Sequence, residues 1–88
     1  MSLAEFTPHE QAMFKVAQLA GRHDGWDGHG AKRVTAPAIA AAIDHIDRLA
    51  EGMPAPGVWP SVGGGVILEW DDRDDSDVTF GPDGEAAP

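Results

Sequence analysis

Apolar residues follow helical spacing in the first part of the chain. Thr7 is a good N-cap, Pro8 suits the first helical position, and Glu10 completes a capping box. The pattern therefore predicts a helix over about residues 8–20, ending near Gly21. Its predicted apolar stripe consists of Met13, Val16, Ala17 and Ala20, widened by Phe14 and Leu19.

A second helical pattern follows a glycine-rich stretch, residues 21–34, which is predicted to be a loop. Thr35 is the expected N-cap, and Gly52 ends the pattern, so the helix should span about residues 36–51. Asp44 and Arg48 lie four residues apart and are expected to form an ion pair on the outer side. The predicted apolar stripe consists of Ile39, Ala42, Ile43, Ile46, Leu49 and Ala50.

The remaining third of the chain has the period of two that is typical of β-strands. Residues 58–62 contain Pro60 and suit an edge strand. Three glycines then precede the clearest strand, residues 66–70, and a third strand is predicted over residues 77–80. The tail, residues 82–88, is too short a pattern to predict a fourth strand.

These elements predict one α+β domain over residues 1–88, because a chain of this length has room for a single core. Two amphipathic helices should pack on one face of a three-stranded antiparallel β-meander, about residues 57–81. Trp26 and Trp70 are assigned to the core, and Trp59 is expected to be partly exposed.

Charge is distributed unevenly along the chain. Residues 66–88 contain eight acidic residues and one basic residue, a balance of −7 within a total of −9. This excess disfavours direct binding to nucleic acid or to an anionic membrane, and it favours a basic protein partner. The predicted partner-binding residues are Glu69, Asp71, Asp72, Asp74, Asp75 and Asp77.

Such a surface suggests mimicry of nucleic acid. Carboxylates two residues apart on one strand face lie about 6.6 Å apart, and duplex DNA carries one charge per roughly 1.7 Å of its axis. We therefore predict a non-enzymatic inhibitor of a basic, nucleic-acid-binding protein, such as a nuclease or a CRISPR effector subunit. An anti-CRISPR protein, an antitoxin or another phage-type inhibitor would fit.

Two alternatives stay open at this point. One is a small scaffold or oligomerising module, including a homodimer, that pairs through an open sheet edge. The other is a metal-dependent regulator that uses the loop from His23 to His29. Imidazole and carboxylate groups are good Zn²⁺ ligands, and Asp24 and Asp27 lie in the same loop. Their spacing matches no recognised metal motif, so no metal or cofactor is predicted.

The sequence gives little support for calcium binding or for catalysis. Residues 72–83 superficially resemble a calcium loop, but the sixth position is Asp77 rather than Gly, and strands flank the segment. The serines lie in no nucleophile motif, so we expect no enzymatic activity. The chain lacks cysteine and shows no signal peptide or membrane span, which favours a cytoplasmic location.

Three motifs stand in a characteristic order: Trp26-Asp27-Gly28-His29-Gly30-Ala31, Gly64-Gly65-Val66-Ile67-Leu68-Glu69-Trp70 and Pro82-Asp83-Gly84. Together they resemble an uncharacterised family of short bacterial and phage-borne open reading frames with a WDGxGA loop and a GG[VI]xLEW strand. The resemblance implies a prokaryotic or mobile-element origin and supplies no activity. Members of that family carry a further strand after the last Asp-Gly. No such strand is predicted from the four residues that follow Gly84 here, so the edge of the third strand is expected to be open.

Overall fold

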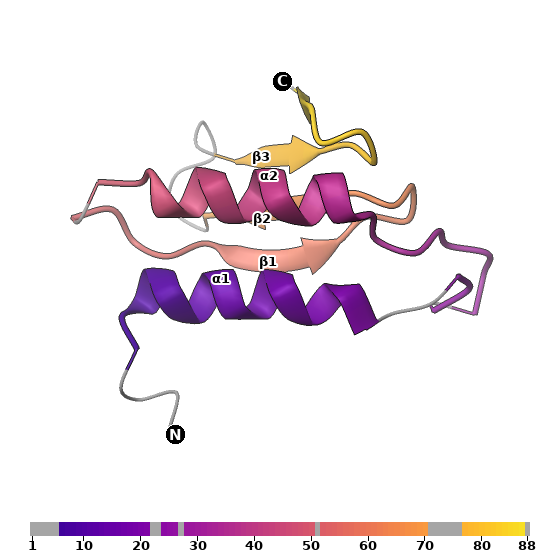
Figure 1. Ribbon diagram of the computed structural model, residues 1–88, viewed down its shortest axis with the longest axis horizontal. Coiled ribbons are helices and arrows are strands. Elements are labelled where there is room, and N and C mark those ends of the chain that lie inside the picture. Colours follow the sequence, from indigo (N-terminus) through magenta and orange to yellow (C-terminus); the bar gives the residue numbers. More distant parts are fainter. Residues whose placement is uncertain (1–5, 22–23, 27, 51, 71–76, 88) are drawn as a thin grey trace.

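The computed structural model describes residues 6–21, 24–26, 28–50, 52–70 and 77–87, and it contains two helices packed on an antiparallel sheet (Figure 1). The helices are α1 (Pro8–Gln18), continued by the 3-10 turn η2 (Leu19–Gly21), and α2 (Ala36–Asp47). The strands are β1 (Gly57–Pro60), β2 (Val66–Glu69), β3 (Val78–Phe80) and β4 (Ala86–Ala87), in the order β1-β2-β3-β4. The predicted α+β fold is confirmed.

Both helices begin at the predicted caps. Thr7 Oγ1 accepts a hydrogen bond from the Glu10 backbone N–H at 3.1 Å, and Glu10 Oε1 accepts one from the Thr7 N–H at 2.9 Å. Thr35 Oγ1 accepts from the Ala38 N–H in the same way. The second helix ends earlier than predicted, at Asp47, with Arg48 as its C-cap. The segment that follows contacts α1, where His9 Nε2 lies 2.6 Å from the Met53 carbonyl oxygen.

The buried stripe of α1 differs from the predicted one. Ala12, Val16 and Leu19 are buried, whereas Ala17 and Ala20 are exposed. Val16 and Leu19 were part of the predicted stripe, and burying Leu19 on this side removes more apolar surface from water than burying Ala17 or Ala20 would. In α2 the buried positions are Ala38, Ala42 and Ile46, while Ala50 is exposed.

The core lies between the helices and one face of the sheet. Figure 1 shows α2 across β2, with α1 alongside it next to β1. Val66 and Leu68 of β2 are completely buried, and Phe80 of β3 and the predicted core residue Trp70 are nearly so. Trp70 also donates its indole N–H to the Pro54 carbonyl at 2.6 Å, so its one polar atom is satisfied inside the core.

The outer edge of β3 is not open over the part that pairs with β4. Thr79 pairs with Ala87 and Phe80 pairs with Ala86, so the expectation of an open third strand is wrong there. The turn between these strands docks on the start of α2: Thr35 Oγ1 donates to the Pro82 carbonyl at 2.6 Å. Gly84 has a φ of +85°, and a Cβ at this position would lie 2.9 Å from the Pro37 carbonyl oxygen. Only glycine combines that backbone angle with that approach.

Candidate functional site

The predicted acidic surface is described by the structure at its two ends. Glu69 is the last residue of β2 and is exposed, and Asp77 immediately precedes β3 and is exposed as well. The predicted residues Asp71, Asp72, Asp74 and Asp75 lie outside the described residues. Of the residues that form the strands, Glu69 is the one that carries a charge.

Asp77 has a structural contact that the sequence did not reveal. Its Oδ1 accepts a hydrogen bond from the Trp70 backbone N–H at 2.7 Å, which ties the residue after β2 to the residue before β3. A hydrogen bond to an ionised carboxylate is stronger than one between neutral groups. Asp77 therefore stabilises the hairpin, whatever its second oxygen binds.

The face of the sheet opposite the helices carries an apolar row. Trp59 of β1 pairs with Ile67 of β2, and Ile67 pairs with Thr79 of β3. Direct partners in an antiparallel sheet project on the same face, and their neighbours Val66, Leu68 and Phe80 project toward the helices. No element among the described residues covers this row, which we call the open-face row. Trp59 is 55% exposed, in agreement with its predicted partial exposure.

Gly57 sets the position of the Trp59 indole. A Cβ at Gly57 would lie 3.3 Å from Trp59 Nε1, so the ring extends along β1 toward Gly57. Gly57 is the register partner of Glu69. The side chains of directly opposed residues start about 4.5–5.5 Å apart, and thus the indole edge lies next to the strand position that carries the Glu69 carboxylate. Trp59 and Glu69 can both be picked out in the sequence, but the register that pairs Gly57 with Glu69 cannot be predicted from either strand alone.

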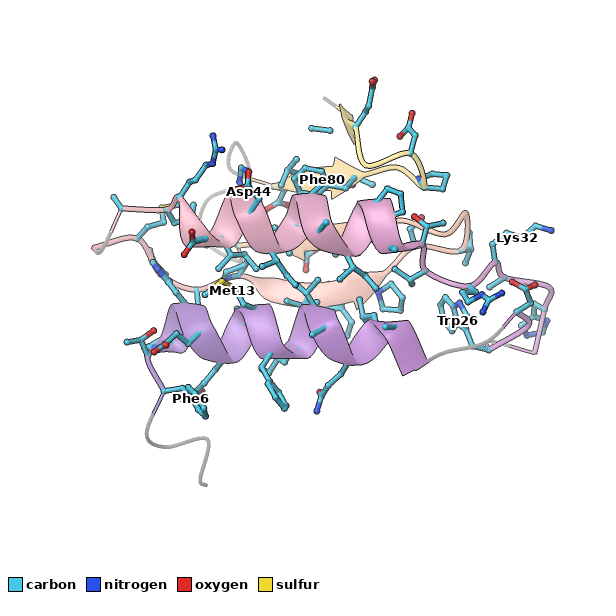
Figure 2. The ribbon with its side chains drawn as sticks, in the orientation of Figure 1. Phe6, Met13, Trp26, Lys32, Asp44 and Phe80 are labelled. Atoms are coloured by element: carbon cyan, nitrogen blue, oxygen red, sulfur yellow. The ribbon has the colours of Figure 1, made fainter. Side chains whose placement is uncertain are left out.

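The glycine-rich loop closes on itself. The Gly25 N–H donates to the Ala31 carbonyl at 2.6 Å, and Asp24 Oδ1 accepts from the Arg33 N–H at 2.8 Å. Trp26 is half-buried and donates its indole N–H to the Lys32 carbonyl at 2.9 Å. Figure 2 shows Trp26 beside Lys32 in this loop, beyond the ends of the helices. Trp26 lies outside the core cluster, so its predicted core position is wrong.

The proposed metal ligands are not assembled in the part of the chain that the structure describes. Asp24 is engaged with the loop backbone, and His29 is exposed. His23 and Asp27 lie outside the described residues. Within the described ranges, no group of three His, Asp or Glu side chains is placed to hold a metal ion. The absence of a metal stays a prediction for the whole loop.

A shallow groove is a second surface of interest. It lies along α2 and is lined by Ile39 and Ile43, together with Asp24, Lys32 and Arg33. Both isoleucines are half-buried and pack against the core. The two basic residues make this groove a poor match for a basic partner, whereas the open-face row has an acidic residue beside it.

Among the described residues, no helix combines the length and apolarity needed to cross a membrane. Comparison of the chain with family models, with curated proteins and with solved structures found no match. The candidate site therefore rests on its own geometry.

Proposed function

We propose that this protein is a non-enzymatic, acidic inhibitor that binds a basic, nucleic-acid-binding protein in the cytoplasm. The observation that carries the proposal is the charge balance of residues 66–88, which is −7 in a protein whose total is −9. A surface of this kind raises the local concentration of basic partners and speeds their association. It repels nucleic acid and anionic lipid for the same reason.

The placement of Glu69 and Asp77 supports a role for the β2–β3 connection. Both exposed acids stand where the chain leaves β2 and enters β3, at the two ends of the segment that holds the other predicted residues. None of the strands that the structure describes contains a basic residue. The proposed partner is a nuclease, a CRISPR effector subunit or another protein whose phosphate-binding surface accepts a row of carboxylates. An anti-CRISPR protein or an antitoxin would act in this way.

The test neutralises the segment without disturbing the hairpin. Asp77 is kept because it bonds the Trp70 N–H, and the quadruple variant is D71N, D72N, D74N and D75N. Blocked octalysine serves as a defined basic probe, and its affinity is measured by calorimetry at about 20 mM and about 200 mM NaCl. We expect wild-type binding to weaken steeply with salt, and the quadruple variant to lose about tenfold or more at low salt.

A matched control variant removes the same number of negative charges, four, from residues outside 66–88. The control variant is E5Q, D44N, D47N and E51Q, in which the exposed Asp44–Arg48 ion pair is lost at little cost to stability. We expect this variant to bind octalysine within about threefold of wild type at low salt. Equal losses in both quadruple variants would show that binding follows net charge alone and would refute the proposed surface.

Inhibition itself is tested on a basic nuclease or effector encoded beside this protein's gene. Adding the wild-type protein to a DNA-cleavage assay should block cleavage at stoichiometric amounts, and the D71N, D72N, D74N and D75N variant should not. If the protein binds the nuclease or effector but does not block DNA cleavage, it is a binding module and the proposed inhibition is wrong.

A further inference from the structure

The open-face row departs from the usual composition of a solvated sheet face. Antiparallel sheets with one face in water normally place polar residues on it, but here the apolar Trp59 and Ile67 are direct partners on that face, with Thr79 next to Ile67. Trp59 is among the most exposed large apolar residues of the described chain. An exposed aromatic in such a row is a feature of surfaces that bind a partner.

The corner of this face holds two complementary groups. The Trp59 indole extends toward Gly57, and Gly57 is paired with Glu69, which is exposed. Because Gly57 has no side chain, the indole can approach its backbone, next to the strand position that carries Glu69. An aromatic ring and a carboxylate on neighbouring strands can together bind a cation.

We propose that Trp59 and Glu69 form an arginine-recognition subsite for a segment of the basic partner, an inference that rests on the proposed function. A guanidinium group stacks on the indole face and donates two parallel N–H bonds to a carboxylate. The lysine ammonium is a compact, strongly hydrated charge. It neither stacks on an aromatic ring as a planar group nor donates two parallel hydrogen bonds to a carboxylate. The subsite therefore adds a preference for arginine to the long-range attraction of the acidic segment.

The charges argue for a basic segment as the occupant rather than a second copy of the chain. Two copies that met through this face would each bring Glu69 and a net charge of −9 to the interface. Such like charges would repel one another. A segment with arginines has the opposite charge and supplies the planar cation that the corner accommodates.

The test compares blocked octa-arginine with blocked octalysine, which carry equal charge, by calorimetry at about 50 mM NaCl. We expect wild type to bind octa-arginine about 5- to 30-fold more tightly than octalysine, the range of a partly desolvated cation–π contact. Trp59→Leu keeps an apolar side chain without a π-system and should abolish the preference. Trp59→Phe keeps an aromatic face and should retain most of it.

Two variants that each lose one negative charge test whether Glu69 is the carboxylate that binds the guanidinium group. Glu69→Gln should lower octa-arginine affinity about threefold or more, because one partner of the bidentate pair loses its charge. Glu85→Gln removes one charge from another exposed position within residues 66–88 and should leave the arginine preference unchanged. Thermal melts close to that of wild type would show that these exposed positions do not affect folding.

The two proposals fail in distinguishable ways. If wild type binds neither peptide, the proposed function and the subsite both fall. If wild type binds both peptides equally and D71N, D72N, D74N and D75N still weakens binding, only the arginine subsite is refuted. Sedimentation that shows a concentration-dependent dimer, lost in Trp59→Leu, would assign the open face to a second copy and overturn the inference.

Discussion

The two faces of the sheet carry apolar residues, but they use them differently. On the helix side, Val66 and Leu68 are completely buried beneath α1 and α2. On the open side, Trp59 is 55% exposed, and Ile67 and Thr79 are half-buried beside it. Apolar area contributes to folding only when it is removed from water. The first face therefore contributes most to the stability of the domain, and the second leaves much of its apolar surface in contact with water.

Two tryptophans on opposite faces give the strongest test of this comparison. Trp70→Ala should lower the free energy of unfolding by about 3–5 kcal/mol, because it empties a core position and leaves the Pro54 carbonyl without its donor. Trp59→Ala should cost less than about 1 kcal/mol, as is usual for an exposed site. Urea denaturation monitored by circular dichroism measures both. Similar losses for the two variants would show that the open face is part of the core.

Neighbouring residues of β2 repeat the comparison on a smaller scale. Leu68→Ala should destabilise the domain by about 2–5 kcal/mol, since Leu68 is completely buried. Ile67→Ala, one position earlier on the open face, should cost about 1 kcal/mol for its partial burial. Thermal unfolding of the two variants checks the order, and a larger loss for Ile67→Ala would contradict the assignment of faces.

The two acidic residues at the ends of the β2–β3 connection should also differ in their contribution to the stability of the domain. Asp77→Ala removes the acceptor of the Trp70 N–H and should cost about 1–2 kcal/mol. Glu69→Ala should change stability by no more than about 0.5 kcal/mol, because the residue is exposed. Asp77→Asn retains an oxygen acceptor and should fall between them. Equal stability of all three variants in denaturant would mean that the 2.7 Å contact contributes nothing.

The smallest expected effect is that of chelation. EDTA should leave the melting temperature unchanged, and elemental analysis of the purified protein should find no stoichiometric zinc or calcium. The reason is that the loop histidines show no recognised ligand spacing. One equivalent of bound metal, lost in His23→Ala or His29→Ala, would instead favour the metal-dependent regulator.

Local chemistry was sufficient to predict both helices and the first three strands. The caps at Thr7 and Thr35, the edge strand with Pro60 and the Asp44–Arg48 pair at 3.0 Å are all confirmed. Each depends on residues a few positions apart, so the sequence contains the whole interaction. The end of α2 and the stripe of α1 were predicted less well, because the packing partners choose among faces that periodicity leaves equivalent.

The three tryptophans show that residue type and local spacing do not predict where a side chain lies in the tertiary structure. All three are large apolar residues, yet Trp70 is in the core, Trp26 bonds its own loop and Trp59 stands on the open face. The glycines around Trp26 predicted a turn correctly but carried no information on whether the ring reaches the helices. That outcome depends on how the loop closes between Gly25 and Ala31.

The sequence by itself determined the charge imbalance, both helices, the first three strands and the α+β class, since these follow from composition and short-range spacing. Tertiary structure alone decided which strand residues meet. Glu69 is paired with Gly57, the residue that the Trp59 indole approaches, and the pairing of β4 with β3 occupies an edge that was expected to be open. The physical reason is that periodicity specifies which face a strand residue takes, whereas register is set by packing between segments distant in the chain.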